Sequence, residues 1–347
     1  MEKSDVVNLI KYHYSKNDDE FYDQAFKIAR EFEDNGDIGI AKMIDSFMKS
    51  RYMFVTQNYE SNSLNLVSTK MKNPLYFPTE LSDDLNGIVR SILSLNGICK
   101  YLLVGQPGTG KTESVKYIAN KTNRKLYSIN MTSLIDSGLG QTLKNIQELF
   151  AKIVNALDCD RSIFLFDELD LIAMDRINQT DVREMGRATS LFLKCLDSLP
   201  NNCILFATTN LGNSIDKALK RRFDYIVNFD VYSKENIAEY GLEILKEYKK
   251  ESFKTSEISI IKKLLIHSVK QLSPADLRNL FRISIAFSNE NNEFEYLKRV
   301  FAKLYSSDLL FDMNFLHDEI GLSSREIELL TGIPKSSVCR KIMEARQ

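Results

Sequence analysis

The chain has 347 residues, of which 44% are hydrophobic, which is ample for an α/β enzyme core with appended modules. Its 46 basic and 47 acidic residues nearly balance, so no global field draws it to nucleic acid or to an anionic membrane. No apolar run approaches the roughly 18 residues of a membrane helix, and the polar start MEKSDVVN is unlike a signal peptide. We therefore expect no membrane segment.

The five cysteines are scattered without CxxC spacing, and several stand in apolar segments. They are Cys99, Cys159, Cys195, Cys203 and Cys339. This pattern predicts reduced thiols in the core and a cytoplasmic protein. The three histidines have no metal-binding arrangement in the sequence.

Residues 1–51 predict a small three-helix bundle. Apolar side chains recur at helical intervals in 5–14 (including Val6 and Ile10), in 21–32 and, after Gly36, in 40–48. From 52 to 79 this periodicity fades into Asn, Ser and Thr with two prolines, which indicates an extended linker.

The run GQPGTGKT at 105–112 fits the pattern G-x-x-x-x-G-K-[ST] of a phosphate-binding loop. The apolar run at 99–104 predicts a buried strand before it, and 113–122 has helical spacing after it. A loop between a strand and a helix can surround a polyphosphate with backbone N–H groups and the helix N-terminus. The context therefore supports nucleotide binding.

Within this loop the residue types suit the parts of a nucleotide. The glycines leave room for close approach, Lys111 supplies positive charge to the β- and γ-phosphates, and the Thr112 hydroxyl can ligate the Mg²⁺ that bridges them. The residues of this segment predicted to bind ATP are Gly105, Gln106, Pro107, Gly108, Thr109, Gly110, Lys111, Thr112 and Glu113.

The apolar run at 163–170 predicts a second buried strand that ends in adjacent acids. Asp167 would hold Mg²⁺ through its water shell, and Glu168 would polarise the water that attacks the γ-phosphate. Asp170 is predicted to cap the next helix. The alternative for such a pair of acids is a strand that simply ends in solvated carboxylates.

A third buried strand at 202–210 ends at Asn210, whose amide can position the attacking water, or can merely turn the chain. The segment 215–229 then places Arg221 and Arg222 side by side before a further strand. Adjacent guanidinium groups suit arginine fingers that reach a neighbouring subunit's γ-phosphate. The alternative is a pair of solvated surface arginines.

Residues 231–305 read as successive helices that would form a lid over the nucleotide. The predicted helices span 233–248, 256–269, 274–288 and 292–305.

The stretch 324–343 matches a helix-turn-helix template with Gly332 at the turn. The side chains spaced to pack are Ile327, Ile333, Val338 and Ile342, and those offered outward include Lys335, Ser336 and Arg340. Against DNA binding, Glu328 stands where a small residue is usual, and residues 321–347 hold five basic and three acidic side chains, a net charge of only +2. A helical protein-docking element is the alternative.

Over about residues 80–290 these segments together resemble an AAA-family ATPase. The matching segments are DDLNGIVRSI (83–92, against adenine), GQPGTGKT (Walker A), LFDELD (165–170, Walker B), ATTN (207–210, sensor 1), ALKRRFD (218–224, arginine finger) and SPADLRNLF (273–281, lid helix). The resemblance implies ATP and Mg²⁺ at the boundaries of a ring, usually of six subunits. It adds Asp84, Gly87 and Ala275 to the predicted ATP-binding residues.

The sequence departs from the family pattern in two places. Gly138, Leu139 and Gly140 stand where the pore loop usually carries an aromatic residue, so the ring of side chains that grips a substrate is missing and the sequence leaves threading of a polypeptide open. In the lid, Pro274 replaces the usual Gly, and Ala275 stands where more distant relatives carry a sensor-2 arginine, for which Arg278 is a candidate replacement.

We therefore predict a P-loop NTPase of α/β class, with a parallel sheet covered by helices on both faces. The predicted parts are a helical module (1–51), a linker (52–79), the ATPase core (80–230), the lid (231–305) and a helix-turn-helix-like module (306–347).

The predicted function is ATP-driven remodelling or regulation of an unidentified protein partner, recruited by a terminal module, by analogy with other helical modules ahead of AAA cores. Glu168, Asn210, Arg221 and Arg222 are the predicted catalytic residues. The alternative is an ATP-dependent DNA-binding ATPase, and a third possibility is the regulatory partner of another enzyme in a bacterial stress or phage-defence system.

Overall fold

A computed structural model describes residues 3–15, 18–34, 36–37, 39–40, 43–44, 64–70, 76–94, 96–131, 134, 141–156, 159–170, 182–248, 255–289 and 294–344. The chain divides into two compact units, Met1–Leu64 and Asn65–Gln347. Within the described residues, no helix combines the length and the apolar character needed to cross a membrane.

In the N-terminal unit, helices α1 (Lys3–Tyr14) and α2 (Asp18–Asp34) pack against each other. The buried Asp5 carboxylate accepts hydrogen bonds from Gln24 Nε2 (2.9 Å) and Lys27 Nζ (2.8 Å) across the pair. The third helix predicted at 40–48 lies mostly outside the described residues.

The apolar side of α1 predicted from its spacing is not buried throughout. Val6 and Ile10 are 37% and 52% exposed, so the expectation that both pack inside the bundle is wrong for the described structure. On α2 the same kind of spacing does mark the buried side, which contains Ala25, Ile28 and Ala29.

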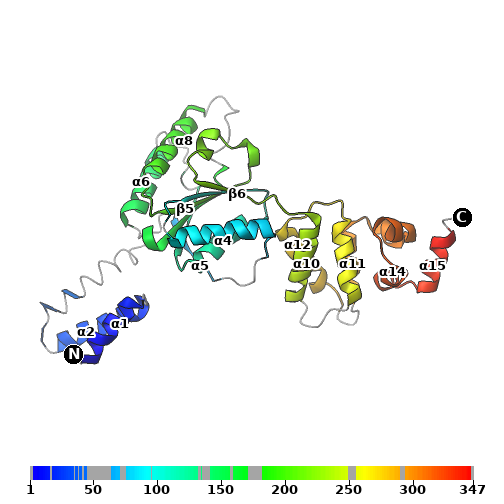
Figure 1. Ribbon diagram of the computed structural model, residues 1–347, viewed down its shortest axis with the longest axis horizontal. Coiled ribbons are helices and arrows are strands. Elements are labelled where there is room, and N and C mark those ends of the chain that lie inside the picture. Colours follow the sequence, from blue (N-terminus) through cyan, green and yellow to red (C-terminus); the bar gives the residue numbers. More distant parts are fainter. Residues whose placement is uncertain are drawn as a thin grey trace. The chain divides into compact units, whose positions relative to one another are not determined.

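Six strands form one sheet in the order β1-β3-β4-β5-β2-β6 (Figure 1). They are β1 (Leu64–Val67), β2 (Lys100–Val104), β3 (Lys125–Asn130), β4 (Ser162–Asp167), β5 (Ile204–Thr209) and β6 (Tyr225–Asn228). The pairs β3/β4, β4/β5, β5/β2 and β2/β6 are parallel. The carboxyl ends of these five strands therefore meet at one edge, and the predicted α/β fold is confirmed.

Helices cover both faces of the sheet (Figure 1). The helices α4 (Thr79–Ser94) and α5 (Lys111–Lys121) share one apolar cluster with β2, β4 and β5, while α6 (Gln141–Ala156) and α8 (Val182–Asp197) pack together over the other face. Successive residues of a strand face opposite sides. On β4 the side chain of Leu165 accordingly joins the first cluster, and that of Phe166 contacts aromatic rings of α6 and α8.

After β6 the chain forms a helical region. Its helices are α10 (Lys234–Tyr248), α11 (Thr255–Ile266), α12 (Pro274–Ala286), α13 (Glu295–Leu304), α14 (Ser324–Thr331) and α15 (Lys335–Glu344). All six contribute to one hydrophobic cluster. The predicted boundary at residue 305 therefore does not separate two hydrophobic cores, and the C-terminal helices are built into the lid.

A partly buried ion pair joins α11 to α14. Lys263 Nζ lies 2.8 Å from Glu326 Oε2, and the same carboxylate completes a capping box with Ser323. Burial disfavours the charged carboxylate, but hydrogen bonds from Lys263, Ser259 and Ser323 outweigh it and lower the pKa of Glu326 to about 2. This carboxylate stays ionised at neutral pH and links the lid to the C-terminal helices.

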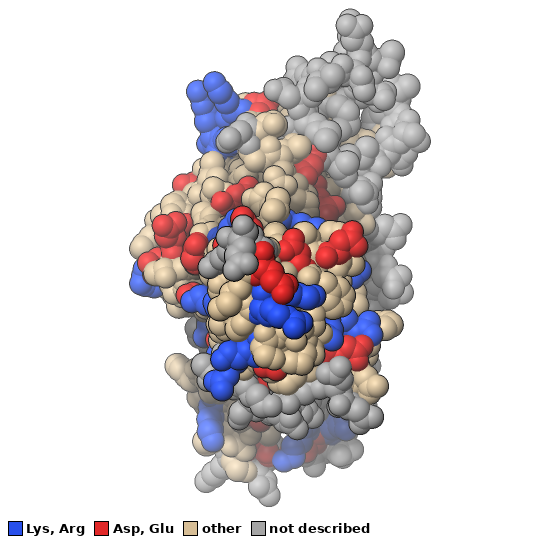
Figure 2. Space-filling model, turned by 90° about the vertical axis from the view of Figure 1, so that its right-hand side faces the viewer, with Lys and Arg blue, Asp and Glu red and all other residues tan. Residues whose placement is uncertain are grey.

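At the C-terminus, helices α14 and α15 follow each other across a turn at Gly332. Gly332 ends α14 in the left-handed region (φ +79°), which explains why glycine stands there, and Ile327 and Val338 are fully buried. Lys335 and Arg340 are exposed on α15. In Figure 2, which turns this end of the chain to the viewer, the described basic side chains are interspersed with acidic ones instead of forming a continuous basic surface.

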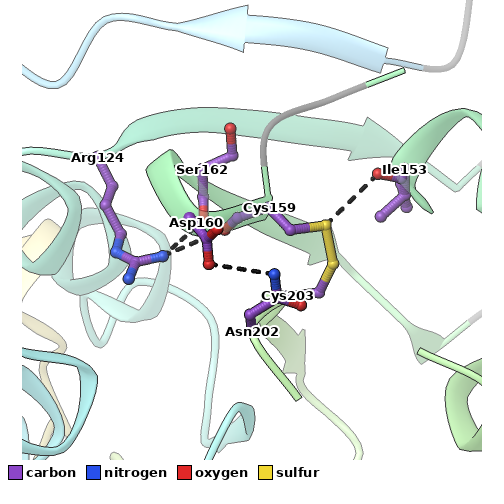
Figure 3. Close-up of a disulfide and its surroundings, with 7 residues drawn as sticks. All are labelled: Arg124, Ile153, Cys159, Asp160, Ser162, Asn202 and Cys203. Atoms are coloured by element: carbon purple, nitrogen blue, oxygen red, sulfur yellow. Dashed lines mark hydrogen bonds between the residues drawn. A yellow bond between two sulfur atoms is a disulfide. The ribbon is translucent and has the colours of Figure 1, made fainter. Parts of the chain in front are cut away.

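A disulfide joins Cys159 and Cys203, with 4.6 Å between their Cα atoms (Figure 3). The two residues precede β4 and β5, so the bond ties the amino ends of neighbouring strands. Cys99, Cys195 and Cys339 are free. The prediction of reduced thiols is therefore wrong for this pair, and a cytoplasmic location no longer follows from the cysteines.

Thiol titration of the unfolded chain under non-reducing conditions should count three thiols, and five after reduction. Since the disulfide spans 44 residues, its loss through Cys159→Ser with Cys203→Ser should lower the free energy of unfolding by about 2–4 kcal/mol. Cys195→Ser is the matched control and should change stability little, because this cysteine is free and only half-buried. Five thiols before reduction would contradict the pairing.

Candidate nucleotide-binding site

The phosphate loop follows β2 and is closely packed on two sides. A Cβ atom at Gly105 would lie 2.8 Å from Phe229 Cβ, and one at Gly108 would lie 2.7 Å from Ser273 Oγ. Gly108 also has a φ of +79°, which side chains rarely tolerate. Only glycine fits at these two positions, as the loop pattern predicted.

Lys111 opens α5 with its amine buried among neutral oxygens. Its Nζ donates to the carbonyl oxygens of Gly105 (2.6 Å) and Gln106 (2.9 Å) and to Asn210 Oδ1 (2.9 Å). Burial lowers the pKa of Lys111, and nearby carboxylates, with Asp230 and Asp170 first, oppose that shift. Among the described residues the amine thus contacts no carboxylate directly, which leaves its charge available to an anionic ligand.

The two residues predicted to hold Mg²⁺ are in direct contact. Thr112 Oγ1 donates to Asp167 Oδ1 at 3.0 Å, and Thr208 Oγ1 donates to the same oxygen at 2.5 Å. Hydroxyl and carboxylate oxygens are ligands that Mg²⁺ prefers, so this donor set fits the ion. The described residues contain no group of three or more His, Cys, Asp or Glu side chains for a metal. Phosphate and water oxygens would have to complete the coordination.

Glu168 has an unusual backbone conformation. Its φ of +57° lies in the left-handed region, which costs a residue other than glycine about 1–3 kcal/mol. The strand ends hold this conformation, because the Glu168 N–H donates to Thr208 Oγ1 at 3.0 Å and the Leu169 N–H donates to the Thr208 carbonyl at 2.8 Å. The side chain is exposed at the edge of the sheet, where it can reach a water molecule.

Asn210 meets the phosphate loop and is itself held by an acid. Its Oδ1 accepts from Lys111 Nζ, while its backbone N–H donates to the Asp170 carboxylate. That carboxylate also accepts from the Thr209 hydroxyl. Asp170 was predicted to cap the next helix. Its partners among the described residues lie at the end of β5, and residues 171–181, where that helix was expected, lie outside the described residues.

The lid touches the phosphate loop directly. The Ala275 N–H, at the start of α12, donates to the Gly108 carbonyl at 3.1 Å, which places the predicted sensor-2 position at the loop. Arg278 does not replace a sensor-2 arginine here, because its guanidinium binds Glu247 (2.8 Å) and Tyr240 (3.3 Å) within the lid.

Two residues after β6 were not among the predicted site residues. Asp230 Oδ1 accepts the Gln106 N–H at 2.7 Å, and the Tyr232 hydroxyl donates to the Thr109 carbonyl at 3.2 Å. Both follow the carboxyl end of a parallel strand, where ligands of such sheets gather. Applying that rule to β6 as well as to β4 and β5 would have found them.

The adenine contact expected for Asp84 stays a prediction. Asp84 lies on α4 and accepts the Tyr225 hydroxyl at 2.6 Å. Tyr225 opens β6 and pairs in register with Tyr101 near the start of β2, away from the phosphate loop. Gly87 lies in the same helix.

The two candidate finger arginines differ in their surroundings. Arg222 is held within its own chain, since its guanidinium donates to the Ala218 carbonyl (3.0 Å) and lies 3.4 Å from Asp197 Oδ1. Arg221 is exposed and has no ion-pair partner among the described residues. The pore-loop residues 138–140 lie outside the described part of the chain.

The sheet order, the glycine-rich loop and the acids at the neighbouring strand end define a P-loop NTPase. Residues 101–231 match the family model described as "ATPase family associated with various cellular activities (AAA)". The chain therefore contains an AAA ATPase domain. Members of this family generally hydrolyse ATP, usually with Mg²⁺.

Known proteins agree with this assignment. The chain is 29% identical over 262 residues to a putative cell division cycle ATPase of Plasmodium falciparum, and 29% identical over 271 residues to the peroxisomal ATPase pex6 of Schizosaccharomyces pombe. These matches cover 70% and 76% of this chain but only 20% and 27% of the relatives, so the chain spans about a quarter of their length.

A solved structure of the Escherichia coli MS115-1 HORMA:CdnC:Trip13 complex contains a similar fold. The TM-score is 0.55 with 16% identity, and the match covers 66% of this chain and 88% of the other. At this identity the likeness concerns the fold alone.

Proposed function

We propose that this chain binds ATP with Mg²⁺, hydrolyses it, and works as a ring of about six subunits that remodels or regulates a protein partner. One observation carries the ATPase part: polar residues that follow β2, β4 and β5 lie at one edge of the sheet. Lys111 is hydrogen-bonded to Asn210 and Thr112 to Asp167, while Glu168 is held at the same edge by its backbone N–H and has an exposed side chain.

Each of these groups would have a distinct task. The Lys111 amine would exchange its carbonyl partners for phosphate oxygens, while Thr112 and Asp167 would hold Mg²⁺, which neutralises phosphate charge when bound. Glu168 would take up the proton of the attacking water, and the Asn210 amide would orient that water. The strained backbone at Glu168 supports such a role, because conformations of this kind cluster at functional sites.

The contacts between the lid and the phosphate loop would couple ATP hydrolysis to movement of the lid. Ala275 is hydrogen-bonded to Gly108 of the phosphate loop, and Tyr232 is hydrogen-bonded to Thr109. A conformational change of the loop on nucleotide binding or release would therefore be transmitted to the lid. Because the lid and the C-terminal helices share one core, both would move together.

For partner docking the N-terminal unit is the stronger candidate. Val7, Ile10 and Tyr14 are exposed at helical spacing on α1, which suits contact with another protein. A second candidate function, ATP-dependent DNA binding, is favoured by the observed α14–α15 geometry, which presents Lys335, Ser336 and Arg340 outward. Acidic side chains are interspersed at the C-terminal end and would repel DNA phosphates, so DNA binding is the weaker candidate function.

Affinity capture from the native host tests both candidates. Tagged full-length Glu168→Gln protein with ATP should retain a protein partner that the Lys111→Ala protein does not retain, and purified wild type should hydrolyse ATP. DNA retained by the Glu168→Gln protein, and lost when Lys335→Glu and Arg340→Glu are added, would favour the second function. Absence of ATP hydrolysis would overturn both.

A further inference from the structure

We propose that Asp170 is a positioning residue for ATP hydrolysis: its carboxylate holds the end of β5 so that the Asn210 amide stands beside Lys111. This inference rests on the proposed ATPase function. In the described part of the chain its hydrogen-bond partners are Thr209 and Asn210, so its hold on the site runs through Asn210.

The Asp170 carboxylate receives two donors from consecutive residues. The Asn210 N–H lies 3.1 Å from Oδ1 and 3.2 Å from Oδ2, and the buried Thr209 hydroxyl donates to Oδ1. Thr209 Oγ1 in turn accepts the Leu211 N–H at 3.1 Å. One carboxylate thus fixes the hydroxyl and the backbone of the turn that presents Asn210.

These bonds are of the strong kind. Hydrogen bonds to an ionised carboxylate are roughly twice as strong as those between neutral groups. The other contacts between the two strand ends involve Thr208, which lies one residue before Thr209 and two before Asn210. Its hydroxyl donates to the Asp167 carboxylate, and the N–H groups of Glu168 and Leu169 donate to its neutral oxygens. Asp170 is therefore the charged contact nearest to Asn210.

The position of Asn210 matters because its amide faces the phosphate loop. Its Oδ1 accepts from Lys111 Nζ at 2.9 Å. Its Nδ2 has no hydrogen-bond partner within the described part of the chain, so it can meet a water molecule. A displacement of about 1 Å at a reacting group can cost on the order of 100-fold in rate.

Asp170, which binds the end of β5, lies close in sequence to the proposed catalytic acids. Asp170 follows Asp167 by three residues and Glu168 by two, so one short segment would carry the metal ligand, the general base and the group that orients Asn210. The water-activating and water-orienting side chains would thereby keep a constant separation during the reaction.

Steady-state hydrolysis and nucleotide binding by the full chain test the inference. Asp170→Ala should lower kcat by about 10-fold or more, with nucleotide affinity changed less than about 3-fold, because Lys111 and the loop remain. Asp170→Asn, which keeps one acceptor oxygen, and Thr209→Val, which removes one donor, should each lose less. The matched control is Asp160→Ala: this carboxylate precedes the other end of β4 and accepts Asn202 Nδ2 at 3.1 Å, so kcat should stay within about 2-fold.

The decisive arm repeats Asp170→Ala in an Asn210→Ala background. If Asp170 acts through Asn210, the second substitution should add almost nothing to the loss in kcat. Losses that multiply, or an Asp170→Ala protein that matches the Asp160→Ala control, would overturn the inference while leaving the ATPase proposal intact. Should Asp170→Ala fail to fold, Thr209→Val and Asp170→Asn carry the same comparison. If the wild-type protein did not hydrolyse ATP, the proposed function itself would be contradicted.

Discussion

Lys111→Ala should abolish detectable nucleotide binding, whereas Glu168→Gln should bind ATP and hydrolyse it about 100- to 1,000-fold more slowly. The Lys111 amine would meet phosphate charge already in the ground state, so its loss removes binding itself. The Glu168 carboxylate would act on water only as the reaction proceeds, so its loss affects the rate. Calorimetric binding and a phosphate-release assay measure the two effects separately.

Lys121→Ala is the control for the first substitution. Lys121 ends the same helix, is exposed and lies over the Tyr117 ring, so its removal changes the charge of α5 without touching the phosphate loop. It should bind nucleotide as wild type does. Tight binding by Lys111→Ala, or full hydrolysis by Glu168→Gln, would be incompatible with the roles assigned to these residues.

Arg221→Ala should reduce hydrolysis by about 1,000-fold, because an arginine finger contributes a factor of this order. Arg222→Ala should reduce it much less, since Arg222 already binds Ala218 and Asp197 in its own chain. The exposed Arg221 is the residue free to reach a neighbouring subunit. This separates two adjacent arginines that the sequence could not distinguish.

Mixing tests whether the finger acts between subunits. In an equal mixture of Arg221→Ala and Lys111→Ala proteins, about a quarter of the boundaries of a closed ring would pair an intact pocket with an intact arginine. Activity should therefore reappear, although each protein alone is nearly inactive. No recovery from correctly folded proteins that assemble together, or equal losses for Arg221→Ala and Arg222→Ala, would count against Arg221 as a finger in trans.

Local patterns in the sequence were enough to identify strands β2, β4, β5 and β6, the lid helices and the phosphate loop, whereas β1 lies in the segment predicted to be a linker and β3 was not predicted. A buried strand, a glycine-rich loop and a helix follow each other between 99 and 122, and each is encoded by residues close together in the chain. The same holds for the turn at Gly332. The contacts of Lys111, Thr112 and Asn210 were predictable as well, because parallel strands bring their carboxyl ends to a common edge.

Contacts between distant segments were decided only by the tertiary structure. Asp84 faces Tyr225, Cys159 pairs with Cys203, and the lid packs with α14 and α15 in one core. Asp170 likewise accepts hydrogen bonds at the end of β5. Each outcome depends on which side chains the packed sheet and helices bring within hydrogen-bond or van der Waals distance. Periodicity along the chain reports which face of an element is buried, but it does not report what lies opposite that face.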